Sequence, residues 1–483
     1  MKIDTGSYDP IGQLTSDLAA ELIGSTNRMN EQLHYAYDAP GNLNYRTNNT
    51  LVENFQVNSV NELTTGTNGG RLTVMGTTSS QATNVTVNGT NALLYGDATF
   101  ASTNMPLTTS YTAIAKDGYG WINTNTATLS LATNSTFQYD LNGNLTNDGT
   151  MSFAYDDENQ LTQVWVPNQW FSQFTYDAKM RRRIRQEYTW SSFWVQTNIV
   201  YYVYDGNTVI QERDINYLPT VSYTRGKDLS GSLEGAGGIG GLLARTDNDA
   251  KQTDFYHADG NGNVMMLINS YQAVVAKYLY DAFGNTLSLS GPIAYANLHR
   301  FSSKEAHQNS GLVYYLYRYY DPNLQRWPNR DPINERGFND LAHRAKAPNL
   351  KEEKDLYRFL ANNPIQYWDY LGLDNPGCDS PGDLPGALCP ANKDCFLRCC
   401  AQHDQCYYKN GCSALSWIIE GDPDCMACNA EVAVCTLMCK AGKDNKKGPR
   451  WFCPNGPDAG KFYWDYSKIP ASCWKDGKKP AQP

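Results

Sequence analysis

Aromatic and polar residues alternate along most of the first 321 residues, and the alternation is interrupted repeatedly by a Tyr-Asp pair, a Gly or Asn, and an aliphatic residue. The tyrosines of these units are Tyr8, Tyr37, Tyr139, Tyr155, Tyr176, Tyr204 and Tyr280. A period of two predicts β-strands with one buried face. Asp accepts backbone N–H bonds in turns, and Gly and Asn tolerate positive φ angles, so each unit predicts a hairpin corner. Because one hairpin cannot bury its own apolar face, the repeats predict stacked strands.

Helical spacing is found only toward the C-terminal end of the chain. Residues 395–408 and 425–439 contain neither Gly nor Pro, and their cysteines recur at helical intervals. Cys399, His403 and Tyr407 share one face of the first segment, because residues four apart lie above one another on a helix. The second segment carries a stripe of its own, formed by Cys428, Cys435 and Cys439. The two stripes predict a pair of helices joined side by side.

Cysteine usage divides the chain into two physically different parts. All 13 cysteines lie between Cys378 and Cys473, and the first 377 residues contain none. A small segment this rich in cysteine predicts a disulfide scaffold formed in an oxidising compartment. The alternative is a zinc cluster, for which Cys425 and Cys428 have the right spacing but no second matching pair is evident.

The net charge and the distribution of apolar residues argue against two classes of protein. The 483 residues carry a net charge of −9, and only 18% of them are charged. Such an acidic chain argues against a protein that binds nucleic acid through an overall basic charge, although a local basic patch could still exist. We expect no nucleic-acid partner. No apolar run is long enough to span a membrane, and Met1–Gly6 has no apolar signal core. We nevertheless expect a secreted or delivered protein, because the predicted disulfides require an oxidising compartment.

The stretch Gly311-Leu312-Val313-Tyr314-Tyr315-Leu316-Tyr317-Arg318-Tyr319-Tyr320-Asp321-Pro322 resembles the core signature of Rhs (rearrangement hotspot) proteins. The Tyr-Asp units upstream resemble the YD repeats of the same family. The resemblance implies a β-strand shell that encloses a variable C-terminal toxin. It divides the chain into a YD-repeat region at 1–310, a core-associated segment at 311–373 and a tail at 374–483.

In some Rhs proteins a pair of aspartates cuts the chain behind the core. Asp331 and Asp369 match that pair, and Leu373 matches the cleavage point, although Tyr370 replaces the family's proline. Two close carboxyl groups can share a proton and divide the acid and base roles. The alternative interpretation is that both aspartates are turn residues.

His403 and Asp404 are the candidate chemical groups of the tail. A histidine held on a rigid helix can act as a general base near neutral pH. The neighbouring carboxylate points about 100° away around the helix, so it is better placed to bind a hard cation than to orient the imidazole. This division of roles predicts metal-assisted hydrolysis. The alternative is a solvated surface pair.

Residues 399–407 resemble the Cys-Cys-x-x-His-Asp-x-Cys-Tyr signature of secreted phospholipase A2. The resemblance implies that His403 is the base, that Asp404 binds calcium, and that Tyr407 supports the site. Asn429 stands where that family has the aspartate that orients the histidine. The upstream glycines Gly382 and Gly386 match the calcium loop only loosely. The implied disulfides are Cys399–Cys435 and Cys406–Cys428.

Together these patterns predict a multidomain toxin, in which a β-rich shell is followed by a small, mostly α-helical, disulfide-rich domain. The predicted activity is calcium-dependent hydrolysis of the sn-2 ester of membrane phospholipids, with a cognate immunity protein as partner. One alternative is a non-catalytic lipid- or protein-binding module, because Asn429 weakens the catalytic pattern. The other is a carbohydrate-binding surface adhesin.

Overall fold

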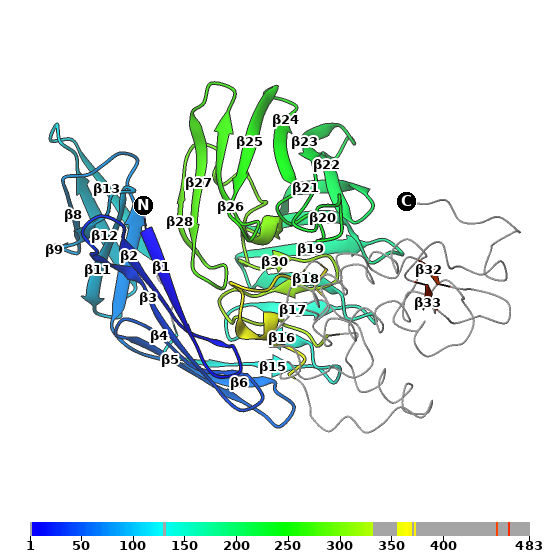
Figure 1. Ribbon diagram of the computed structural model, residues 1–483, viewed down its shortest axis with the longest axis horizontal. Helices are drawn as coiled ribbons and strands as arrows, with labels where there is room; N and C mark the ends of the chain where they lie inside the picture. Colours follow the sequence, from blue (N-terminus) through cyan, green and yellow to red (C-terminus); the bar gives the residue numbers. More distant parts are fainter. Residues whose placement is uncertain are drawn as a thin grey trace, which may run out of the picture. The chain divides into compact units, whose positions relative to one another are not determined.

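A computed structural model describes residues 2–128, 132–331, 355–369 and 371–372, and the backbone of two short strands nearer the C-terminus (Figure 1). The chain divides into two units, 1–335 with 353–374 and 336–352 with 375–483. In the second unit, β32 (Trp451–Phe452) pairs antiparallel with β33 (Phe462–Tyr463).

A sheet of seven strands contains the N-terminal part of the first unit, and every pairing in it is antiparallel. In order across the sheet its strands are β1 (Lys2–Tyr8), β2 (Leu14–Glu21), β3 (Asn27–Tyr37), β4 (Leu43–Asn48), β5 (Leu51–Val57), β6 (Leu63–Gly70) and β14 (Asn134–Thr136). Two small sheets lie between β6 and β14 in sequence. The first is formed by β10 (Leu93–Leu94), β11 (Thr99–Met105) and β7 (Leu72–Thr77), and the second by β13 (Ile122–Thr128), β12 (Ser110–Lys116), β8 (Asn84–Val87) and β9 (Thr90–Asn91).

A second large sheet follows and contains fourteen strands, each paired with its neighbour in sequence. They are β15 (Gln138–Tyr139), β16 (Leu145–Asn147), β17 (Ser152–Tyr155), β18 (Leu161–Val166), β19 (Trp170–Tyr176), β20 (Arg182–Trp190), β21 (Trp194–Asp205), β22 (Thr208–Arg213), β23 (Pro219–Arg225), β24 (Leu242–Asp247), β25 (Gln252–Ala258), β26 (Val264–Asn269), β27 (Val274–Tyr280) and β28 (Thr286–Ser290). The prediction of a β-rich region built from hairpins is confirmed. Among the described residues the only helices are two short 3₁₀ turns, η1 (Phe301–Ser303) and η2 (Leu360–Asn362). Of the predicted helical domain at 374–483 only the backbone of β32 and β33 is described, and the two predicted helices at 395–408 and 425–439 lie outside the described residues.

The repeat corners have the structure that the Tyr-Asp units predict. At the first corner, Asp9 Oδ1 accepts the backbone N–H groups of Ile11 and Gln13 at 3.1 and 2.9 Å, and Gly12 has a φ of +91°. The Oδ2 atom of Asp9 accepts the side-chain amide of Gln13. Six further corners repeat this geometry: Oδ1 of the aspartate accepts the N–H of the fourth following residue, and Oδ2 accepts that residue's side chain. Their aspartates are Asp38, Asp140, Asp156, Asp177, Asp259 and Asp281. The unit at Tyr204 differs, because Asp205 pairs directly with Thr208 across a tight turn.

The tyrosine of a repeat joins it to the preceding repeat. Tyr280 Oη donates to the carbonyl of Val264 at 2.8 Å, and Tyr37 Oη donates to that of Leu14 at 2.9 Å. The rings of these tyrosines are buried or half-buried, so each hydroxyl finds its acceptor inside the protein. The tyrosine therefore packs the core with its ring and fixes the spacing of the repeats with its hydroxyl.

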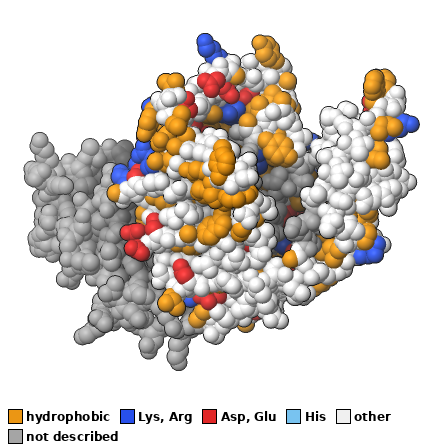
Figure 2. Space-filling model, turned by 180° about the vertical axis from the view of Figure 1, so that it is seen from behind, with side chains coloured by type: hydrophobic (Ala, Val, Ile, Leu, Met, Phe, Trp, Pro, Cys, Tyr) orange, Lys and Arg blue, Asp and Glu red, His pale blue; other side chains and the backbone are white. Residues whose placement is uncertain are grey.

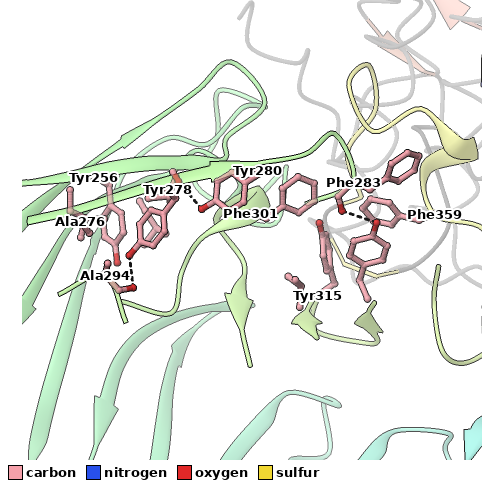
Figure 3. Packing of buried hydrophobic residues seen from close by; sticks show 14 of the residues in the cluster. Tyr256, Ala276, Tyr278, Tyr280, Phe283, Ala294, Phe301, Tyr315 and Phe359 are labelled. Carbon is pink, nitrogen blue, oxygen red and sulfur yellow. Dashed lines mark hydrogen bonds between the residues drawn. The ribbon is translucent and has the colours of Figure 1, made fainter. Parts of the chain in front are cut away.

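Segment 294–331 and residues 355–372 contribute buried aromatic side chains to the main core, beside residues of both large sheets. This part contains the three short strands β29 (Glu305–Ala306), β30 (Val313–Tyr314) and β31 (Tyr319–Tyr320). Tyr320 stacks on Phe359 with ring centroids 3.7 Å apart, and both rings lie edge-on to Trp327. Figure 3 shows how Phe283, Tyr315 and Phe359 meet in this cluster. The segment that resembles the Rhs core is therefore part of the hydrophobic core.

Apolar side chains also occur on the outer surface, scattered in patches among polar ones (Figure 2). No helix among the described residues has the length and apolar character that a membrane crossing needs.

Candidate cleavage site at the end of the β-rich region

Two aspartates from distant parts of the chain meet around one arginine. Arg318 Nη2 lies 2.8 Å from Asp331 Oδ2 and 4.0 Å from Asp369 Oδ2. The exposed fractions of these residues are 2% for Arg318, 0% for Asp331 and 4% for Asp369. Both aspartates that the sequence predicts for self-cleavage therefore lie within reach of the same buried guanidinium.

Contacts on every side fix the position of Arg318. Its guanidinium lies 4.1 Å from the ring centre of Trp327, and its Nη1 donates to the carbonyl of Leu356 at 3.4 Å. Its Nε donates to the carbonyl of Gly372, the residue directly before the predicted cleavage point. Arg318 therefore joins the carboxyl pair to the backbone at the end of the β-rich region.

The turn that carries Arg318 is strained. Leu316 has a φ of +86°, in the left-handed region that a branched side chain rarely adopts. Hydrogen bonds hold the turn on both sides, since Tyr315 N–H donates to the Arg318 carbonyl at 2.9 Å and Tyr317 N–H donates to the Leu371 carbonyl at 3.0 Å. The strained turn is therefore tied directly to residues 371–372.

Asp369 holds the same short stretch from the other side. Its Oδ1 accepts the N–H groups of Leu371 and Gly372 at 3.0 and 2.8 Å. Gly372 has a φ of +76°, and a Cβ there would lie 3.0 Å from the backbone nitrogen of Arg318. Only glycine suits this close approach, so the backbone is fixed one residue before the predicted cut.

Burial raises the pKa of Asp369 to about 7, although Arg318 and the two backbone N–H groups act in the opposite direction. The charge of Asp331 adds to the upward shift. A carboxyl group with this pKa is a proton donor near neutral pH, while the neighbouring Asp331 forms the direct ion pair with Arg318. One acid and one carboxylate side by side can divide proton donation and proton removal.

Many aspartates of the repeat corners accept backbone N–H groups in turns, so this feature alone does not indicate a catalytic site. Asp369 differs from those aspartates because it also approaches a guanidinium shared with a second buried carboxyl group. Arg318 was absent from the residues that the sequence indicated. Its position in the sequence could have indicated it, because Arg318 is the one charged residue in the aromatic run 314–320. An arginine buried among aromatic residues needs acidic partners.

The other predicted site residues lie outside the described residues. They are Leu373, Gly382, Gly386, His403, Asp404, Tyr407 and Asn429. Within the described ranges, no group of three or more His, Cys, Asp and Glu side chains is placed to hold a metal ion. The predicted calcium site and the predicted disulfides, whose cysteines all follow Gly372, thus stay predictions from sequence.

The relatives by sequence include two tRNA nucleases and a deaminase toxin. The tRNA3(Ser)-specific nuclease WapA of Bacillus spizizenii is 32% identical over 209 residues, which are 42% of this chain and 8% of that protein. The tRNA nuclease WapA of Bacillus subtilis is 29% identical over the same shares. The double-stranded DNA deaminase toxin A of Burkholderia cenocepacia is 24% identical over 229 residues, 44% of this chain and 16% of the toxin. The chain thus covers less than a fifth of the length of each.

Among solved structures, the crystal structure of TcdB2-TccC3-TEV is a match. It matches 77% of this chain and 18% of its own, with 16% identity and a TM-score of 0.38, which is too low to support an argument. No family model matches the chain.

The sequence relatives contradict the predicted function. They are named as nucleases and a deaminase, so the predictions of phospholipase A2 activity and of a phospholipid substrate are wrong, and the predicted absence of a nucleic-acid partner is wrong as well. The phospholipase prediction depended on nine residues of one segment, a local pattern. The nucleic-acid prediction used the net charge of the whole chain, which does not report on a local surface. The lipid-binding and adhesin alternatives find no support in these names.

Proposed function

We propose that the β-rich region is the carrier part of a delivered toxin of the Rhs type, and that it cuts the chain between Leu373 and Asp374, one residue beyond the clamped Gly372. The observation that carries the proposal is the pair Asp331 and Asp369, buried around Arg318 at the point where the backbone is clamped. The sequence relatives named as nucleases and as a deaminase toxin support the assignment to a toxin.

The chemistry requires one water molecule. Asp331 takes a proton from the water, whose oxygen adds to the carbonyl carbon of Leu373. Asp369 gives its proton to the peptide nitrogen of Asp374, and the C–N bond breaks to leave a carboxyl group on Leu373 and an amine on Asp374. Arg318 keeps its charge throughout and holds both carboxyl groups in place.

The test is to follow cleavage of the full chain after purification. Wild-type protein should give fragments 1–373 and 374–483, while Asp331→Asn and Asp369→Asn should each stay whole, because each removes one proton-transferring group. The matched control is Asp321→Asn, which changes a buried aspartate that accepts the N–H of Leu324 at 3.0 Å.

Circular dichroism of each variant separates a lost reaction from a lost fold. A folded Asp331→Asn chain that is cut as fast as wild type would overturn the proposal. If Asp331→Asn does not fold, Arg318→Lys provides the second variant. Lysine keeps the charge but not the fork that spans both carboxyl groups, so cleavage should slow strongly.

We further propose that the released segment 374–483 acts on nucleic acid. The support is that the relatives are named as tRNA nucleases and a double-stranded DNA deaminase. The cut protein should be incubated with tRNA and with duplex DNA, and strand breaks and base changes should be measured. Parallel reactions with calcium and with a chelator test the ion predicted at Asp404. Intact tRNA and unchanged DNA in every reaction would contradict this target class.

A further inference from the structure

A serine, a histidine and a carboxylate lie in hydrogen-bond contact at the turn between β29 and β30. His307 Nδ1 lies 2.7 Å from Ser310 Oγ, and His307 Nε2 lies 3.2 Å from Glu187 Oε1, which belongs to β20. A hydroxyl, an imidazole and a carboxylate in this order activate the serine of enzymes on several unrelated folds. The three residues are separate from the carboxyl pair around Arg318 and have no role in the proposed cleavage.

Hydrogen bonds set the imidazole in the tautomer that can take a proton from the serine. The backbone N–H of Ser310 donates to His307 Nδ1 at 3.3 Å, so we assign this nitrogen as the acceptor and place the ring proton on Nε2. Nε2–H then donates to Glu187, and the hydroxyl of Ser310 donates to Nδ1. His307 is 1% exposed, and the rings of Trp170 and Phe174 pack against it with ring centres at 6.2 and 5.5 Å. The orientation of the imidazole is therefore fixed.

Glu187 holds the far side of the imidazole and has partners on both oxygens. Its Oε1 accepts the bond from His307 and lies 3.5 Å from Arg185 Nη1. Its Oε2 accepts the hydroxyl of Ser172 and the side-chain amide of Asn309. Burial on its own would raise the pKa of Glu187, but His307 and Arg185 outweigh burial and lower it. The resulting carboxylate can stabilise the positive charge that an imidazole gains when it takes a proton.

The serine is accessible, although its base is buried. The turn is closed by bonds from Gly311 N–H to the His307 carbonyl at 2.8 Å and from His307 N–H to the Leu312 carbonyl at 2.7 Å. Ser310 is half-buried, and the two residues before it are exposed. Gly311 has a φ of +74°, and a Cβ at this position would meet no atom within 4 Å. A small molecule therefore has open space beside the hydroxyl.

We propose that Ser310 is a nucleophile that accepts acyl groups from small activated carboxylic esters, with His307 as its general base and Glu187 as the residue that positions the imidazole. Ser310 Oγ adds to the carbonyl carbon of the ester while its proton passes to His307 Nδ1. His307 then gives this proton to the leaving oxygen as the C–O bond of the ester breaks. A water molecule repeats the two proton transfers, releases the carboxylic acid and restores the hydroxyl.

The test is to incubate the full chain with a fluorophosphonate probe, which modifies activated serines, and to locate the modified residue by peptide mass spectrometry. Wild type should carry the probe on Ser310, and p-nitrophenyl acetate should leave an acetyl group on the same residue. Ser310→Ala should lose both modifications. The matched control, Ser192→Ala, changes an exposed serine in the turn between β20 and β21 and should leave the modification of Ser310 unchanged.

Glu187→Gln tests the positioning role, because glutamine keeps an oxygen that can accept Nε2–H but carries no charge. The maximal rate of modification should fall by about a hundredfold or more, while the probe concentration that gives half of this rate should stay the same. A purely structural role of Glu187 would reduce the amount of folded chain, which circular dichroism measures, and would leave the rate per folded molecule unchanged.

A folded wild-type chain whose Ser310 stays unmodified by both reagents would overturn the proposal, since the hydroxyl would then only cap the turn. Equal rates for wild type and a folded Glu187→Gln chain would overturn it as well. If Ser310→Ala does not fold, the rate of Glu187→Gln decides. The Asp331→Asn chain should be modified like wild type, so this proposal and the proposed cleavage fail separately.

Discussion

Arg182 offers the sharpest test of how the core of the β-rich region is held together. Its side chain is fully buried, and its Nη2 forms an ion pair with Glu305. Its Nη1 donates to Tyr319 Oη at 2.9 Å, and its guanidinium lies 4.3 Å from the ring centre of Tyr314. We predict that Arg182→Met destabilises the protein strongly, because it leaves the carboxylate of Glu305 buried with weaker partners.

The pKa of Glu305 gives the magnitude. Burial on its own would raise this pKa, but Arg182 and Arg185 outweigh burial and lower it from 4.5 to about 2. Lowering the pKa of Glu305 from 4.5 to about 2 corresponds to about 3 kcal/mol. Removing one partner of a buried ion pair costs about 3–5 kcal/mol in other proteins. The expected loss in the free energy of unfolding is therefore about 3–5 kcal/mol at pH 7.

The pH dependence supplies a second, independent readout. A carboxyl group whose pKa is depressed in the folded state stabilises the fold above its unfolded pKa, near 4.5, and this stability is lost as the pH falls toward 2. Without Arg182 the pKa of Glu305 should rise, so the difference between wild type and variant should shrink between pH 7 and pH 3.

Urea unfolding of the full chain, followed by tryptophan fluorescence at both pH values, measures the two quantities. The control is Arg183→Met, since the side chain of the next arginine is 43% exposed and should lose no more than about 1 kcal/mol. A loss below about 1 kcal/mol for Arg182→Met, or a loss equal at both pH values, would show that the ion pair between Arg182 and Glu305 does not stabilise the core.

Three further predictions follow from single contacts. Tyr280→Phe removes a buried hydrogen bond of 2.8 Å and should cost about 1–2 kcal/mol in urea unfolding, while Tyr45→Phe, at a ring 36% exposed, should cost almost nothing. Gly284→Ala should lower the thermal midpoint by several degrees in a calorimeter, because φ is +93° and the new Cβ would lie 2.6 Å from the ring of Phe301. Cleavage should slow as the pH rises through about 7, because Asp369 then loses the proton it donates. The rate can be measured by gel electrophoresis of samples quenched at successive times.

The turns of the repeats could be predicted from sequence, because each residue type in them has one clear structural role. A corner such as Asp281 to Asn285 could be predicted because the aspartate, the glycine and the amide act within five residues of one another. The hydroxyl bond from Tyr280 to the preceding repeat could not be predicted, since it depends on how the strands stack. Hydrogen bonds within one corner could therefore be predicted from sequence, whereas contacts between repeats became known only from the structure.

The candidate site shows the same limit. Asp331 and Asp369 were identified by the motifs around them, but the sequence does not show which cation lies between them. Arg318 is 13 residues from one and far from the other in sequence, and only folding brings its guanidinium to both. The function predicted for the tail was wrong because it depended on a short pattern at 399–407, whereas sequence relatives of the chain are named as nucleases and a deaminase toxin.

The most direct test of the central claim is the intact mass of the purified full chain. Wild type should give two masses, those of residues 1–373 and 374–483, while Asp331→Asn and Asp369→Asn should each give one uncut mass. A folded wild-type chain that keeps its full mass at neutral pH, or a cut at another position that survives in both variants, would contradict it.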